Sequence, residues 1–212
     1  KALDTDLARP KFAIMNPEIT YTLPDYQTQC GCADIMMHTM ERYFVLEDTM
    51  EITDKIAQDV MKNVMKYAKI LKKDPENYEA RAEIMWCGSL SHNGLTGCGT
   101  CGGDWATHLI EHELGGMFDV AHGAGLAAVW GSWARYVMDE KPERFAQFAV
   151  DVMGVEESDD VKSTALKGIE AVEEFYRMIE MPTNMKELGI NPTDEQIKDM
   201  AMKATNHDTQ QL

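Results

Sequence analysis

The 212-residue sequence predicts an all-α fold, a multi-helix bundle with little β-structure. Apolar residues recur at helical spacing, capping residues precede the periodic stretches, and prolines or glycines follow them. In the segment 54–72, for example, Ile56, Val60, Val64 and Leu71 fall on one helical stripe. A chain of this length can also bury the full core of one domain.

Seven or eight helices are predicted, several of them with a recognisable start. Asn77 is the expected N-cap of the third helix, and Thr193 followed three residues later by Gln196 is a capping-box pattern before the last. Thr53 and Ser158 are the expected N-caps of the second and seventh helices. The predicted helical segments are 25–45, 54–72, 78–91, 104–115, 124–137, 142–153, 158–179 and 193–203.

The first 24 residues differ from the rest because three prolines, Pro10, Pro17 and Pro24, disfavour a helix there. Within this stretch, residues 12–15 predict a short strand, since apolar residues follow one another without helical spacing.

The composition argues against several classes of partner. A formal net charge of −16 disfavours binding to nucleic acid or to anionic membrane surfaces, both of which require clustered Lys and Arg. The longest apolar run, at 123–134, is too short to span a bilayer. Five cysteines, an odd number, fit a reducing compartment better than a disulfide framework. We therefore expect a cytoplasmic protein.

Three of the six histidines fall within one stretch, residues 104–125. His108 and His112 are four residues apart, so they share one face of a helix. In a continuous helix His122 would lie about 21 Å beyond His108, too far to share an ion. The glycine pair at 115–116 predicts a break that lets a second helix bring His122 back.

A helix expected upstream, within 25–47, supplies a further pair, Asp34 and His38, at i and i+4. One carboxylate with three imidazoles forms a mixed nitrogen and oxygen set suited to Zn²⁺ or Fe²⁺. Spacing alone does not decide which of the three downstream histidines stays outside such a set. Of the two other histidines, His92 is expected at a loop edge and His207 in the C-terminal tail, neither with a role at the site.

These residues match a known pattern. D-x-x-x-H followed by HxxxHxLGxxxxxxHGxG resembles the metal-binding helical domain, a dehydroquinate synthase-like α-domain, of iron-containing (group III) alcohol dehydrogenases. The segments NPEITYTLP and GDWATHLIEHEL resemble the butanol dehydrogenase branch. The resemblance implies that Asp34, His38, His108 and His122 hold the divalent metal, Fe²⁺ or Zn²⁺. It also implies that His112 faces the nicotinamide ring as a catalytic proton-relay residue.

The resemblance further implies a domain organisation and an activity. Residues 1–24 would be a linker from a missing N-terminal nucleotide-binding α/β domain, and residues 25–212 the helical metal-binding catalytic domain, truncated at its C-terminal end. Because no G-x-G-x-x-G loop occurs in the sequence, NAD or NADP would be bound mainly by the missing domain. The expected reaction is reduction of a small aldehyde or oxidation of a primary alcohol. The fragment alone should be inactive, and the full-length enzyme is expected to form a homodimer.

Two alternative functions remain open from the sequence. His108-Leu-Ile-Glu111-His112 also satisfies H-x-x-E-H, the pattern of a zinc hydrolase, with Glu111 as general base and Glu187 as third ligand. That interpretation leaves His122 and the upstream Asp-His pair without a role. In the preferred interpretation Glu111 is only a polar neighbour. The other alternative is a non-catalytic helical module that binds a metal.

The cysteines offer a second metal-site pattern, Cys30-x-Cys32 with Cys98-x-x-Cys101. On a helix, however, Cys30 and Cys32 point about 200° apart and cannot both reach one ion. We therefore expect free thiols, with Cys98 and Cys101 in a glycine-rich loop at 93–103 beside the active site.

Overall fold

The computed structural model describes residues 5–46 and 50–205, and within them the chain is helical without any β-strand. The all-α prediction is confirmed. None of the described helices is long and apolar enough to cross a membrane. The α-helices are α1 (Asp25–Tyr43), α2 (Glu51–Leu71), α3 (Tyr78–His92), α4 (Ala106–Phe118), α5 (His122–Val137), α6 (Pro142–Asp151), α7 (Val161–Met178) and α8 (Asp194–Ala204). The 3-10 helices are η1 (Asp6–Ala8), η2 (Pro17–Thr22), η3 (Leu95–Gly97) and η4 (Met138–Glu140).

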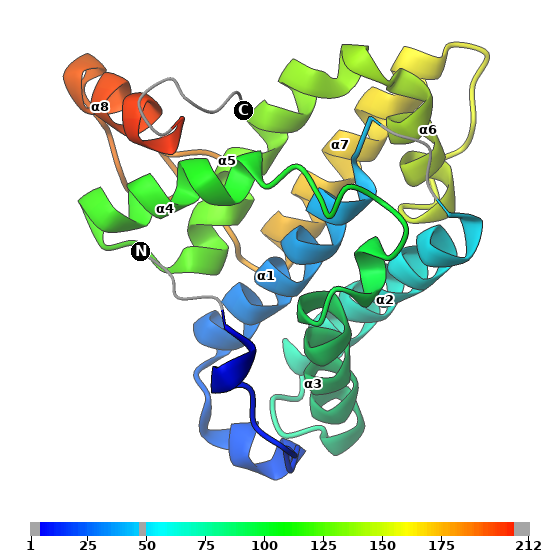
Figure 1. The fold of residues 1–212 in the computed structure, drawn as a ribbon, viewed down its shortest axis with the longest axis vertical. Helices are drawn as coiled ribbons and strands as arrows, with labels where there is room; N and C mark the ends of the chain where they lie inside the picture. The colour runs from blue at the N-terminus through cyan, green and yellow to red at the C-terminus, as the bar shows by residue number, and fades with distance from the viewer. Residues whose placement is uncertain (1–4, 47–49, 206–212) are drawn as a thin grey trace.

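Helix α1 lies at the centre of the domain (Figure 1). Helices α2 and α3 pack against it on one side and α5 on another, while α4 joins α5 and carries α8. Helices α6 and α7 pack against each other, and α7 also contacts α5. The first helix is therefore enclosed by its neighbours along much of its length.

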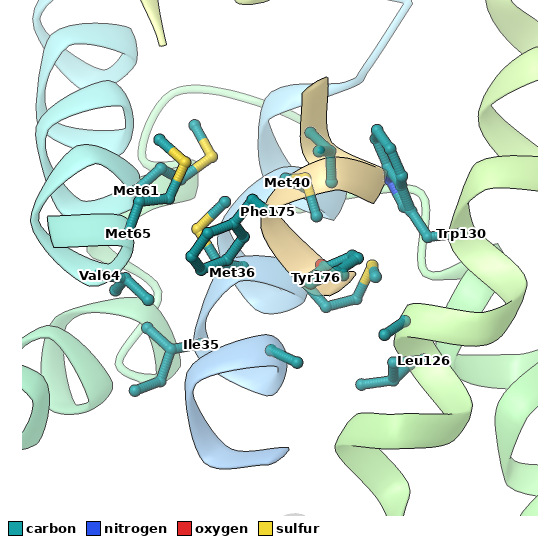
Figure 2. Packing of buried hydrophobic residues seen from close by; sticks show 14 of the residues in the cluster. Ile35, Met36, Met40, Met61, Val64, Met65, Leu126, Trp130, Phe175 and Tyr176 are labelled. Carbon is teal, nitrogen blue, oxygen red and sulfur yellow. The ribbon is translucent and has the colours of Figure 1, made fainter. Parts of the chain in front are cut away.

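The main core forms where α1, α2, α5 and α7 meet (Figure 2). Met36 and Met40 of α1 are fully buried, and they pack in one cluster with Met61 of α2, Trp130 of α5 and Phe175 of α7. Each such side chain contributes about 1.5–3 kcal/mol when it leaves water. Unbranched methionines fill an irregular space between helices of different direction without strained rotamers.

Two of the predicted helix starts are confirmed. The Asn77 side chain accepts a hydrogen bond from the Ala80 N–H at 3.0 Å, as an N-cap should. Thr193 and Gln196 form a complete capping box, in which each side chain accepts from the backbone N–H of the other.

Two other predicted N-caps are wrong. Helix α2 already begins at Glu51, so Thr53 lies in its first turn and donates its hydroxyl to the Cys98 carbonyl at 2.8 Å. The N-cap of α7 is Asp160 rather than Ser158. Several residues near a helix start can cap it, and tertiary contacts decide which one does.

The short strand predicted at 12–15 does not form. All residues from 7 to 16 are exposed, including Phe12 at 79% and Ile14 at 86%. A strand requires a neighbouring strand to accept and donate its backbone hydrogen bonds, and the described residues offer none.

The predicted break between His112 and His122 exists, but not at the glycine pair. Helix α4 continues through residues 115–116 and ends at Phe118, after which Asp119 adopts a left-handed conformation at φ +53°. Glycine in a helix costs only about 1 kcal/mol, which is not enough to end it, and Asp tolerates the left-handed region.

Candidate metal centre

One polar stripe runs along the otherwise buried α1. Asp34, His38 and Glu41 occupy positions i, i+4 and i+7, so all three point to the same side of the helix. Glu41 is fully buried, and the side chains of Asp34 and His38 are 24% and 19% exposed. Polar groups in such surroundings require partners, and these come from α3, α4 and α5.

A close helix contact brings α5 to this stripe. A Cβ atom on Gly123 would lie 2.0 Å from the carbonyl oxygen of Cys30, so only glycine permits the approach. Cys30 lies one turn before Asp34 on α1, and His122 is the first residue of α5. The contact therefore places the His122 imidazole against Asp34.

Three histidine Nε2 atoms face a single oxygen, Asp34 Oδ1. The distances to it are 3.7 Å from His38, 3.6 Å from His108 and 3.4 Å from His122. These are long for hydrogen bonds. They match the spacing of about 3.3–3.4 Å between tetrahedral ligands bonded to an ion at about 2.0–2.1 Å.

Buried atoms at this point also lack partners. Asp34 Oδ1 and His108 Nε2 have no hydrogen-bond partner in the part of the chain that the structure describes. An unpaired buried acceptor costs about 1–3 kcal/mol, and a divalent cation at this position would satisfy both. Asp34, His38 and His108 offer ligand atoms within 4.8 Å of one another, and His122 faces the same Asp34 oxygen. The four residues thus fit a metal ion by their chemistry and their unmet bonding.

Two glutamates that sequence reasoning missed hold two of the histidines. The Glu41 carboxylate accepts from His108 Nδ1, and also from the His108 backbone N–H at 3.1 Å. Glu111 accepts from His122 Nδ1, and it is only 1% exposed, so it is not the passive polar neighbour we expected. A proton held on Nδ1 leaves the Nε2 lone pair free to bind a cation. The i, i+4, i+7 spacing of Asp34, His38 and Glu41 could have revealed one of these glutamates.

His112 lies beside this set rather than within it. Its ring centroid is 6.0 Å from that of His108 and 5.4 Å from that of His122. Glu111, His112 and His122 form a second group with potential ligand atoms within 4.8 Å of one another. We assign His122 to the Asp34 set because Glu111 already occupies its Nδ1, and its remaining nitrogen, Nε2, faces Asp34 Oδ1. Burial and the neighbouring His122 lower the pKa of His112.

His92 also reaches the site, which the sequence did not indicate. It is the last residue of α3, as a loop-edge position requires, but its Nε2 lies 3.2 Å from Asp34 Oδ2. Its ring packs on that of His38 with centroids 3.8 Å apart.

The electrostatics favour a cation. Burial works to raise the pKa of Asp34, but the neighbouring His108 and His122 outweigh it and hold the pKa well below its usual range. Asp34 and Glu111 together raise the pKa of His122 to about 10, against its burial. Burial lowers the pKa of His38 to about 3. Near neutral pH the site therefore presents a carboxylate and a neutral imidazole, and a cation would replace the proton on His122.

Trp105 forms one wall of the site from a strained backbone position. It precedes α4 at φ +66°, in the left-handed region that is unusual for a large side chain. Its ring meets those of His38 and His108 edge-on at 5.3 and 5.2 Å, and the Arg42 guanidinium lies 4.6 Å from its centroid. Its indole N–H donates to the Gly102 carbonyl at 3.0 Å, which anchors the loop before α4.

The cysteines are free thiols in the structure, as expected. Cys30 and Cys32 are buried, whereas Cys98 and Cys101 are exposed on the loop before α4. Neither group of potential metal ligands in the described ranges includes a cysteine. His207 lies outside the described residues.

The hydrolase pattern does not assemble. Glu187, its expected third ligand, accepts hydrogen bonds from the Thr183 N–H at 2.8 Å and hydroxyl at 3.0 Å. Glu111, its expected general base, is bonded to His122 instead. The H-x-x-E-H spacing is thus present, but the third ligand and the general base of a zinc hydrolase are both engaged elsewhere.

Fold and site together define an all-α domain with a candidate metal centre between its helices. A model of the Fe-containing alcohol dehydrogenase family, C-terminal region, matches residues 28–212, and the chain belongs to this family. It is 36% identical to NADH-dependent butanol dehydrogenase A of Clostridium acetobutylicum over 186 aligned residues. These residues cover 87% of this chain and 48% of the relative.

Other comparisons agree with this assignment. NADPH-dependent aldehyde reductase YqhD of Escherichia coli is 33% identical over 205 residues, which cover 96% of this chain and 52% of the relative. The crystal structure of an NADH-dependent butanol dehydrogenase A from Thermotoga maritima superposes with a TM-score of 0.90 at 34% identity, covering 99% of this chain and 52% of that one. The chain thus spans about half the length of the relatives it matches.

Proposed function

We propose that this chain is the metal- and substrate-side domain of an NAD(P)H-dependent alcohol dehydrogenase. The reaction interconverts small primary alcohols and aldehydes. The observation that carries the proposal is the convergence of three histidine Nε2 atoms on Asp34 Oδ1, with buried atoms that lack partners. The names of the relatives, butanol dehydrogenase and aldehyde reductase, support the substrate class.

Asp34, His38, His108 and His122 would hold one divalent ion. When bound, the ion supplies Lewis-acid polarisation of the substrate oxygen. The family description names iron, and a set of three imidazoles and one carboxylate also suits zinc. Four protein ligands leave room for a substrate oxygen, which a fifth would crowd.

His112 is the proposed proton-transfer residue. It is exposed and stands next to the ligand set on the same face of α4 as His108, so it can pass a proton between the substrate oxygen and solvent. Under the proposal it also faces the nicotinamide ring. NAD or NADP binds mainly to a domain outside this chain, and the full-length enzyme is a homodimer with neither nucleic acid nor membrane as partner.

Comparing His112→Ala with His122→Ala tests the assignment. After anaerobic loading with Fe²⁺ or Zn²⁺, mass spectrometry of the washed chain should find one ion per molecule in His112→Ala and a clear loss in His122→Ala. In the full-length enzyme His112→Ala should keep its ion yet turn over aldehyde more slowly, with a changed pH profile. Loss of the ion from His112→Ala, or a His112 nitrogen at a bonding distance of about 2.0–2.1 Å, would contradict the assignment.

A further inference from the structure

The three histidines that face Asp34 are not held in the same way. His108 and His122 each have Nδ1 bonded to a buried glutamate. His38 Nδ1 is buried but has no hydrogen-bond partner within the described part of the chain. A hydrogen bond on the second nitrogen normally fixes the orientation of a metal-binding imidazole. Another contact must therefore orient the His38 ring.

His92 provides that contact. Its ring packs on the His38 ring with centroids 3.8 Å apart and planes inclined by 32°, while Trp105 meets the same ring edge-on at 5.3 Å. Aromatic rings in such contact resist rotation, since turning one would drive it into the other. The His92 ring thus orients His38 by packing, whereas His108 and His122 are oriented by hydrogen bonds to glutamates.

His92 also engages the carboxylate. Its Nε2 lies 3.2 Å from Asp34 Oδ2, the oxygen that does not face the three histidines. Its Nδ1 lies 2.7 Å from Ser91 Oγ and 2.9 Å from the Gly88 carbonyl. The Ser91 hydroxyl donates to the Gly88 carbonyl at 3.0 Å. Because a carboxylate only accepts, the contact with Asp34 requires the proton on Nε2, which donates to Oδ2. In the other neutral tautomer two lone pairs would oppose each other at Asp34, which is unfavourable.

We infer that His92 is a positioning residue of the metal centre. Its N–H occupies Asp34 Oδ2, so that the carboxylate offers only Oδ1 to an ion, and its ring fixes His38. The inference rests on the proposed function. A carboxylate can bind through one oxygen or through two, and binding through two would fill the position that a catalytic ion keeps open for substrate. His92 would thereby preserve an open coordination position without touching the ion.

Binding of Co²⁺ to the 212-residue chain tests this role, because the visible absorption of Co²⁺ weakens as its coordination number rises from four to five and six. His92→Phe keeps a ring against His38 but removes the N–H, whereas His92→Gln keeps an N–H donor without the ring. Trp86→Phe, on the same helix and 54% exposed, serves as the matched control. Circular dichroism of each metal-free variant establishes that it is folded.

We expect His92→Phe to lower the absorption of bound Co²⁺ as Asp34 turns to bind through both oxygens, and His92→Gln to restore it toward the wild-type intensity. Each variant should bind Co²⁺ about 10-fold more weakly than wild type, the usual effect of losing an outer contact to a ligand. His92→Ala, which loses both contacts, should show both changes, and it carries the test should His92→Phe not fold.

Wild-type absorption and affinity in His92→Phe or His92→Ala would overturn the inference while leaving the proposed metal centre intact. Equal spectra for the Phe and Gln variants would also overturn it, because the N–H would then have no effect. Failure of the wild-type chain to bind Co²⁺ would refute the proposed metal centre itself, and this role with it.

Discussion

Two buried polar clusters in this domain differ in whether their bonds are complete. In the Arg144 cluster, Arg144 donates to both carboxylate oxygens of Asp54 at 2.6 and 2.7 Å, to the Tyr43 carbonyl at 2.9 Å and to Gln147 at 3.1 Å. Its guanidinium also lies 3.5 Å from the centroid of the Tyr43 ring. This cluster ties α6 to α1 and α2, and its guanidinium is well supplied with partners from the protein.

The histidine cluster, formed by Asp34, His38, His108 and His122, is incomplete. Its outer side is well bonded, through Glu41 and Glu111, but its centre holds buried atoms without partners among the described residues. The comparison gives a criterion that separates structural polar groups from a candidate ligand site. A polar cluster that completes its own bonds serves stability, and one whose unpaired atoms converge on a point serves a ligand.

The largest effect should come from removing two of the proposed ligands. His108→Ala with His122→Ala should weaken binding of Zn²⁺ or Co²⁺ by a factor on the order of 1000 or more, since a four-ligand site contributes about 10–16 kcal/mol. Competition with a chromophoric chelator measures the change. Glu187→Gln is the control and should bind as wild type does; stoichiometric metal in the double variant would refute the site.

Breaking the Arg144 cluster should affect stability rather than metal binding. Arg144→Met removes the two-fold ion pair that Arg144 makes with the buried Asp54 carboxylate, which should reduce the free energy of unfolding by about 3–5 kcal/mol. Urea denaturation measures this loss. Combining Arg144→Met with Asp54→Leu should cost less than Arg144→Met alone, because the buried carboxylate is then removed together with the guanidinium that binds it. If the folded Arg144→Met variant no longer bound a metal ion, the two clusters would not act separately.

The glutamates behind the histidines should have an intermediate effect. Glu41→Gln and Glu111→Gln should each weaken metal binding about 10- to 100-fold, because the histidine they orient becomes a poorer ligand. Glu41 should have the larger effect, since it is fully buried and bonds both the ring and the backbone of His108. Calorimetric titration distinguishes them, and equal affinity to wild type in both variants would show that the glutamates do not support the ligands.

The smallest effect is expected at a partly exposed pair, Asp25 and Lys72. Burial would raise the pKa of Asp25, but the Lys72 ammonium outweighs it and the pKa is lowered. A carboxyl whose folded pKa is lowered adds stability above its unfolded value of about 3.9, and that stability is lost as the pH falls through the lowered value. Lys72→Met should therefore reduce unfolding free energy by about 0.5 kcal/mol at neutral pH, with the difference from wild type shrinking in acid. A difference that grew in acid would contradict this assignment.

Much of the fold and part of the site could be predicted from local sequence signals. Helical periodicity, Asn77 and the Thr193–Gln196 pair indicated helices that the structure contains. The i, i+4 spacing of Asp34 with His38 placed both on one face, as observed. The prediction of a strand at 12–15 was wrong because a strand depends on a partner strand elsewhere in the chain, which local sequence does not reveal.

By itself, the sequence determined that this chain is helical and which residues could bind a metal, because helix geometry fixes relations between residues a few positions apart. Only the tertiary structure decided how those residues meet. The bonds from Glu41 to His108 and from His92 to Asp34 join residues 67 and 58 positions apart. They depend on how the helices pack, and in one place on the missing Cβ of Gly123, which no periodicity encodes.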